Sequence, residues 1–169
     1  MKNIILIGMP GAGKSTIGVI LAKTLGIDFM DTDIEIQKRT GEVLCKTLER
    51  VGVKGLLDEE EAAIKALDLT SRRCVVATGG SAVLREDSMK HLKDNGVCVY
   101  LNLPYTVISR RVKNRDTRGI AAENHETLKD IYEYRAPFYE KYADFTVDCK
   151  GKSVEKNVAE ILRVLIGIE

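Results

Sequence analysis

Residues 8–15 of the chain read GMPGAGKS, and this stretch determines how the rest of the sequence is interpreted. It matches the phosphate-binding pattern G-x-x-x-x-G-K-[ST] at every fixed position. The aliphatic run 3–7 precedes it and predicts a strand that is buried on both faces. After it, apolar residues recur at helical spacing as far as Leu25, and Gly26 marks the end of the helix. Strand, glycine loop and helix form the local structure that a phosphate-binding loop requires, whereas an ordinary glycine-rich turn would only connect the two elements.

The residue types in this loop suit an anionic ligand. Glycines leave room for phosphate oxygens, and the backbone amides of the loop and of the first helical turn point toward the anion. Lys14 adds a positive charge for the outer phosphates, and the Ser15 hydroxyl is a ligand for Mg²⁺. The predicted nucleotide-binding residues of this segment are Gly11, Ala12, Gly13, Lys14, Ser15 and Thr16.

Length and composition limit the possible functions. The 169 residues predict a single domain over 1–169, and the net charge of +1 together with the absence of tryptophan argues against a nucleic-acid surface. No apolar run reaches the length of a membrane span, and because the first expected strand begins at residue 3 we expect no cleavable signal peptide. Four scattered cysteines with no metal-binding spacing favour a reducing, cytoplasmic compartment. We expect a monomer that acts on a small molecule.

Strand-like and helix-like segments alternate along the chain, which predicts an α/β fold with a parallel sheet flanked by helices. Gly52 and Gly55 are expected to interrupt the chain after a short helix at 43–50, and the acidic run 58–61 is expected to open the next helix and to cap it. The expected strands cover residues 3–7, 29–33, 74–77, 97–101 and 144–148, and the other expected helices cover residues 14–25, 34–39, 86–94, 105–112, 126–141 and 153 onward.

Asp31 and Asp33 follow the second expected strand and stand two residues apart, so on an extended segment they project to the same side. One carboxylate could ligate Mg²⁺ with Ser15, and the other could accept a hydrogen bond from an acceptor hydroxyl. Alternatively the pair forms an Asx-type turn with Asp33 as a helix N-cap. Because ligands bind beyond the carboxyl ends of parallel strands, we favour a function for at least one of them.

Three later segments offer further ligand contacts. Gly79 and Gly80 follow a buried strand and permit close approach of a ligand to the backbone, although a tight turn would need the same residues. Arg118 ends an arginine-rich stretch that either is a solvated helix end or closes over the nucleotide. Arg135 is expected to clamp a carboxylate or to pair with a nearby acid.

Taken together, these motifs resemble the shikimate kinases, which belong to the nucleoside-monophosphate-kinase-like group. The resemblance covers almost the whole chain and rests on an ordered set of segments. These segments are 8–15, 29–33 followed by 39–41, 79–80, the stretch ending at Arg118, and 134–139.

The resemblance implies a three-layer P-loop kinase fold with a five-stranded parallel sheet and a mobile lid at about 112–125. It further implies transfer of the γ-phosphate of ATP, with Mg²⁺, to a ring hydroxyl of shikimate in aromatic amino-acid biosynthesis. The acceptor would bind over about 33–60 and at Gly79, Gly80 and Arg135. The resemblance implies that Lys14, Asp33 and Arg118 are catalytic, that Ser15 and Asp31 serve the metal, and that Arg111 and Asp148 lie beside the adenine.

The sequence departs from the family pattern on the acceptor side. Leu57 stands where the family has the second arginine of the carboxylate clamp, Ser81 replaces a third glycine, and Gly119 follows the lid arginine in place of proline. These departures keep two alternatives open. The acceptor could be another hydroxylated metabolite such as a sugar acid or polyol, or the chain could be a non-catalytic nucleotide-binding regulator. The retained Lys14 and Asp33 favour an enzyme.

Overall fold

The computed structural model describes residues 2–113, 119–123 and 126–166. Its strands form one parallel sheet in the order β2-β3-β1-β4-β5, so the predicted five-stranded parallel sheet is confirmed. Each strand pairs in register with its neighbour; for example, Ile4 lies opposite Val75 on one side and Val97 on the other. The strands are β1 Asn3–Ile7, β2 Asp28–Asp31, β3 Cys74–Ala77, β4 Gly96–Asn102 and β5 Phe145–Asp148.

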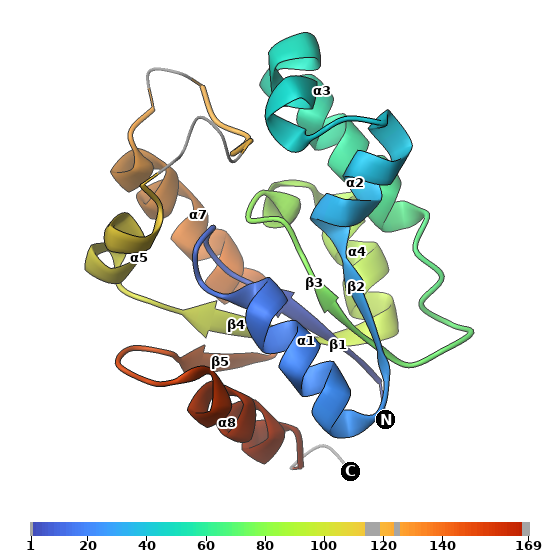
Figure 1. Ribbon diagram of the computed structural model, residues 1–169, viewed down its shortest axis with the longest axis vertical. Coiled ribbons are helices and arrows are strands. Elements are labelled where there is room, and N and C mark those ends of the chain that lie inside the picture. Colours follow the sequence, from blue (N-terminus) through green and yellow to red (C-terminus); the bar gives the residue numbers. More distant parts are fainter. Residues whose placement is uncertain (1, 114–118, 124–125, 167–169) are drawn as a thin grey trace.

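Helices cover both faces of this sheet. In Figure 1, α1 and α8 lie together on one face, while α4 and α7 lie behind the sheet on the other. This arrangement follows from right-handed crossovers between parallel strands. The helices are α1 Lys14–Leu25, α2 Thr32–Thr40, α3 Leu44–Lys65, α4 Glu86–Asn95, α5 Tyr105–Arg111, α7 Leu128–Tyr142 and α8 Val154–Ile166, with a short 3₁₀ turn, η1, at Ala82–Leu84.

The main core lies in the centre of the sheet. Every residue of β1 and of β3 is buried, as expected for strands with helices on both faces. A second, smaller apolar cluster joins α2, α3 and the segment after α5, and it consists of Ile36, Leu56, Ala63 and Ala121. This cluster holds the two helices next to the carboxyl ends of the strands, where Figure 1 shows them projecting beyond the sheet.

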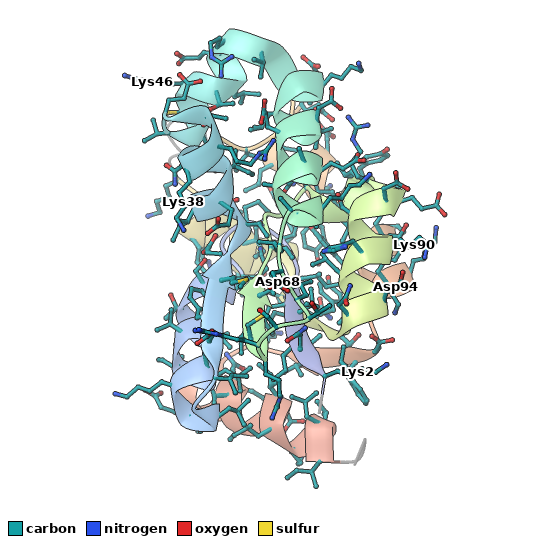
Figure 2. All side chains as sticks on the ribbon, turned by 90° about the vertical axis from the view of Figure 1, so that its right-hand side faces the viewer. Lys2, Lys38, Lys46, Asp68, Lys90 and Asp94 are labelled. Atoms are coloured by element: carbon teal, nitrogen blue, oxygen red, sulfur yellow. The ribbon has the colours of Figure 1, made fainter. Side chains whose placement is uncertain are left out.

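Apart from the site residues described below, charged side chains of the helices lie mainly on their outer surface. Figure 2 shows Lys90 and Asp94 on the outer side of α4, and the two form an exposed ion pair with an N–O distance of 2.7 Å. Such an exposed pair adds little to stability. Over the described part of the chain, no helix combines the length and the apolar character that crossing a membrane requires.

The region 43–65 differs from the sequence expectation. Only Gly52 interrupts α3, with φ 71° and ψ −178°, whereas Gly55 is part of the helix. The acidic run 58–61 therefore lies inside α3 and caps nothing, so the expectation that it opens a helix was wrong. The helix resumes directly after Gly52, which places residues 56, 60, 63 and 64 on its buried face.

Candidate active site

The phosphate-binding loop connects β1 to α1 at the carboxyl edge of the sheet. Gly11 and Gly13 have φ values of 83° and 91°, a conformation that side-chain-bearing residues rarely adopt. Lys14 is buried, and its Nζ donates hydrogen bonds to the carbonyl oxygens of Gly8, at 2.7 Å, and Met9, at 2.8 Å. The ammonium group is thus held at the mouth of the loop, where the outer phosphates of a nucleotide would lie.

Ser15 and Asp31 form a pair of oxygen ligands next to this loop. The Ser15 hydroxyl donates to Oδ2 of Asp31 at 2.6 Å, and Oδ1 of Asp31 accepts from the backbone N–H of Asp33 at 3.0 Å. Asp31 is therefore the N-cap of α2, and the alternative that gave this role to Asp33 was wrong. A hydroxyl and a carboxylate beside a phosphate site are the ligands that Mg²⁺ takes in nucleotide-binding proteins, so the residues present fit this ion.

Asp33 lies in the first turn of α2 rather than on an extended segment, so it does not project from a strand together with Asp31. Its carboxylate faces Gly79, which follows β3. A Cβ on Gly79 would lie 3.0 Å from Oδ1 of Asp33 and would overlap Oε1 of Glu60. The backbone N–H of Gly79 donates to Oγ1 of Thr32 at 2.8 Å, which fixes the turn against α2.

Gly80 brings the same turn next to the loop and to Arg135. A Cβ on Gly80 would lie 2.6 Å from Cδ of Pro10 and 3.2 Å from Nη1 of Arg135. The carbonyl oxygen of Gly80 accepts a hydrogen bond of 2.6 Å from the Tyr139 hydroxyl. Both residues of α7 in this contact are buried, since Arg135 is 2 % exposed and Tyr139 is 0 % exposed. Glycine is required at 80 because a Cβ there would overlap Pro10 and crowd Arg135.

Glu60 is a site residue that the sequence interpretation missed. It is 3 % exposed, and its Oε2 accepts a hydrogen bond of 2.5 Å from the Ser81 hydroxyl. Burial raises the pKa of the Glu60 carboxyl to about 7, and the negative charge of Asp33 acts in the same direction. The hydrogen bond from Ser81 and the positive charges of Arg135 and Lys14 lower this pKa. A continuous helical pattern through 56, 60, 63 and 64 was the signal for burial at this position.

One cavity of about 150 Å³ joins the loop to this cluster. Its lining residues come from both ends of the predicted site, so nucleotide-side and acceptor-side residues face the same space. On the nucleotide side these residues are Pro10, Gly11, Gly13, Lys14, Ser15 and Thr16, and on the acceptor side they include Asp33, Gly79, Gly80, Ser81 and Arg135. Ala12 lies in the same loop but is buried and does not line the cavity.

Residues 119–121 also line the cavity. Gly119 has a φ of 68°, and a Cβ there would lie 2.5 Å from Cβ of Leu44 at the start of α3. Proline cannot adopt this φ, which explains why glycine replaces the proline of the family pattern. Ala121 accepts a hydrogen bond of 2.7 Å from Nη2 of Arg135. Arg118, the predicted lid arginine, lies outside the described residues.

Two residues expected beside the adenine lie apart from the cavity lining. Nη1 of Arg111 donates to the carbonyl oxygen of Gly11 at 3.1 Å, so this arginine flanks the loop. Asp148 ends β5, where it is exposed and accepts from the backbone N–H of Lys150 at 2.9 Å. The structure therefore brings Arg111 to the nucleotide end, while Asp148 remains at the edge strand of the sheet.

A second cavity of about 330 Å³ lies on the other side of Arg135. Leu57, at the position of the expected clamp arginine, lines it together with Arg85. Arg85 is paired with Asp58, at an N–O distance of 2.6 Å. The acceptor side thus has apolar surface where the family pattern places a second guanidinium group.

Comparison with known proteins gives a consistent result. The family model described as shikimate kinase matches residues 10–166. A curated shikimate kinase from Thermodesulfovibrio yellowstonii is 40 % identical over 165 residues, which covers 96 % of this chain and 94 % of the relative. The structure of a shikimate kinase from Acinetobacter baumannii in complex with shikimate superposes with a TM-score of 0.91 at 29 % identity, covering 100 % of this chain and 95 % of that one. The shikimate kinase from Aquifex aeolicus gives a TM-score of 0.84 at 33 % identity, with 98 % of this chain and 96 % of that one covered.

Proposed function

The chain belongs to the shikimate kinase family, and we propose that it transfers the γ-phosphate of ATP to a hydroxyl group of shikimate. Enzymes of this family are phosphotransferases with an alcohol acceptor and use ATP as co-substrate. The observation that carries the proposal is the single cavity that the phosphate-binding loop shares with Asp33, Gly79, Gly80 and Arg135. A phosphate held at one end of this space faces an acceptor held at the other.

The nucleotide end positions the transferring phosphate. We assign the loop amides of residues 11–16 and the Lys14 ammonium to the phosphates, because phosphoryl transfer depends mainly on positioning and on neutralising charge. Ser15 and Asp31 would hold Mg²⁺, which, when bound, neutralises charge on the phosphate oxygens. Arg111 would lie against the adenine and Asp148 at its far edge. Arg118 would approach from the lid.

The acceptor end positions the hydroxyl group. Asp33 would accept the hydrogen bond of the attacking hydroxyl, and Arg135 would bind the acceptor carboxylate, while Gly79 and Gly80 supply backbone to the wall of the pocket. In the transfer, a bond forms between the acceptor oxygen and the γ-phosphorus, and the bond from that phosphorus to the bridging oxygen of ATP breaks. The hydroxyl proton passes to Asp33, and ADP leaves.

The test is ADP release from MgATP with and without shikimate, over a concentration series that reaches millimolar. We expect saturable stimulation in the wild type and its loss in Lys14→Ala, because this variant removes a charge from the transferring phosphates. Lys23→Ala is the matched control, since Lys23 lies exposed in the last turn of the same helix.

Other outcomes of this assay decide between the alternatives. Stimulation by a sugar acid or polyol but not by shikimate would move the proposal to another hydroxylated acceptor, which the apolar Leu57 favours. Binding of ATP without transfer to any acceptor would instead indicate a nucleotide-binding regulator.

A further inference from the structure

One carboxylate oxygen of Glu60 has no hydrogen-bond donor within the described part of the chain. Its Oε2 accepts the Ser81 hydroxyl, whereas no described residue donates to Oε1. That oxygen lies next to Gly79, which lines the same cavity as Asp33. Because Glu60 is 3 % exposed, bulk water replaces the missing partner poorly.

Among the described residues, the acceptor end places two carboxylates beside one guanidinium group. Asp33 and Glu60 converge at Gly79, and Arg135 lies next to Gly80. Lys14 also acts on Glu60, but we assign its charge to the phosphates. Arg85, in the neighbouring cavity, is already paired with Asp58. At position 57, where an arginine would balance Glu60, the side chain is leucine. A purely anionic acceptor would pair with Arg135 and, with Lys14 assigned to the phosphates, would bring no positive charge to the Glu60 carboxyl.

An acceptor with an ammonium group removes this imbalance. A buried carboxylate is stabilised by a charged donor, and a charge-assisted hydrogen bond of this kind is among the stronger polar contacts in proteins. The same acceptor needs a carboxylate for Arg135 and a hydroxyl for Asp33. Carboxylate, ammonium and hydroxyl groups on one small molecule define a hydroxy-α-amino acid.

We propose that the acceptor site also phosphorylates small hydroxy-α-amino acids, whose ammonium group binds Glu60 and whose carboxylate binds Arg135. The inference rests on the phosphoryl transfer proposed above and extends it to a second class of acceptor. The hydroxyl oxygen bonds to the γ-phosphorus, the bond to the bridging oxygen of ATP breaks, and the hydroxyl proton passes to Asp33. The ammonium group stays protonated, and the products are ADP and an O-phospho-amino acid.

The test compares acceptors that differ only in the amino group. ADP release from MgATP is measured with L-serine against 3-hydroxypropionate and with L-homoserine against 4-hydroxybutyrate, and the phosphorylated product is identified by mass spectrometry. In at least one pair we expect the kcat/KM of the amino acid to be about ten- to a hundred-fold higher than that of its deaminated partner, because one charge-assisted hydrogen bond corresponds to a factor of this size. Glu60→Gln should reduce this ratio to near one, whereas Glu49→Gln, at an exposed position of the same helix, should keep it.

The outcomes separate this inference from the function on which it rests. Turnover of shikimate, combined with amino acids that are no better than their deaminated partners, would overturn the inference and leave the proposed kinase activity standing. Failure of every acceptor, shikimate included, in protein that binds MgATP would overturn both. The wild-type comparison does not depend on any variant being folded.

Discussion

Replacement of Glu60 by glutamine should change how the stability of the protein depends on pH. The pKa of this carboxyl is raised from 4.5 to about 7, so between these values the folded protein holds a proton that the unfolded chain has lost. The stability that Glu60 contributes is therefore fully present below pH 4.5 and is lost as the pH rises from there through about 7. The pKa difference corresponds to about 3 kcal/mol in the free energy of unfolding. Glutamine can still accept the Ser81 hydroxyl but does not titrate.

The assay is urea unfolding of the wild type and of Glu60→Gln at about pH 5 and about pH 8, below and above the raised pKa. The free energy of unfolding of the variant, taken relative to that of the wild type, should be about 3 kcal/mol higher at pH 8 than at pH 5. Glu49→Gln, on the exposed side of the same helix, should show no such gain. If the stability difference between Glu60→Gln and the wild type is the same at both pH values, Glu60 titrates in the folded protein as it does in the unfolded chain and its pKa is not raised.

Three further substitutions test the acceptor end. Leu57→Arg should lower the KM for shikimate about ten-fold or more in the ADP-release assay, by adding a charge-assisted contact, and an unchanged KM would show that position 57 does not face the acceptor. Gly79→Ala should raise the acceptor KM and cost about 1–3 kcal/mol in urea unfolding, because its Cβ overlaps Glu60; a normal acceptor KM would contradict this. Tyr139→Phe should cost about 1–3 kcal/mol in the same unfolding measurement by leaving the Gly80 carbonyl unpaired, and equal stability would mean that this oxygen has another partner.

The sequence predicted the parts of the fold that local pattern determines. The loop 8–15 and the five strands follow from glycine positions and from apolar runs of strand length, and the structure has them close to the expected bounds. The exceptions are residues 32–33, which begin α2 instead of ending the second strand, and the region 43–65, where two expected helices are one. The predicted site residues Lys14, Asp33, Gly79, Gly80 and Arg135 line one cavity, because the carboxyl ends of parallel strands meet at one edge of the sheet.

The rest depends on contacts between distant segments. Glu60 looked like a capping residue because the two glycines before it suggested a break, whereas only Gly52 departs from helical geometry. Its role becomes visible once Ser81 and Gly79, about twenty residues later, are placed against it. The need for glycine at 119 similarly arises from its contact with Leu44, which no local pattern reports.

³¹P NMR of the reaction mixture decides whether the protein transfers the γ-phosphate of ATP to an alcohol. The wild type is incubated with MgATP and shikimate, beside an Asp33→Asn sample that lacks the carboxylate proposed to receive the hydroxyl proton. We expect a new phosphomonoester signal that grows with that of ADP in the wild type and is strongly reduced in Asp33→Asn. If the wild type releases the γ-phosphate only as inorganic phosphate, with no phosphomonoester, it does not transfer phosphate to this acceptor.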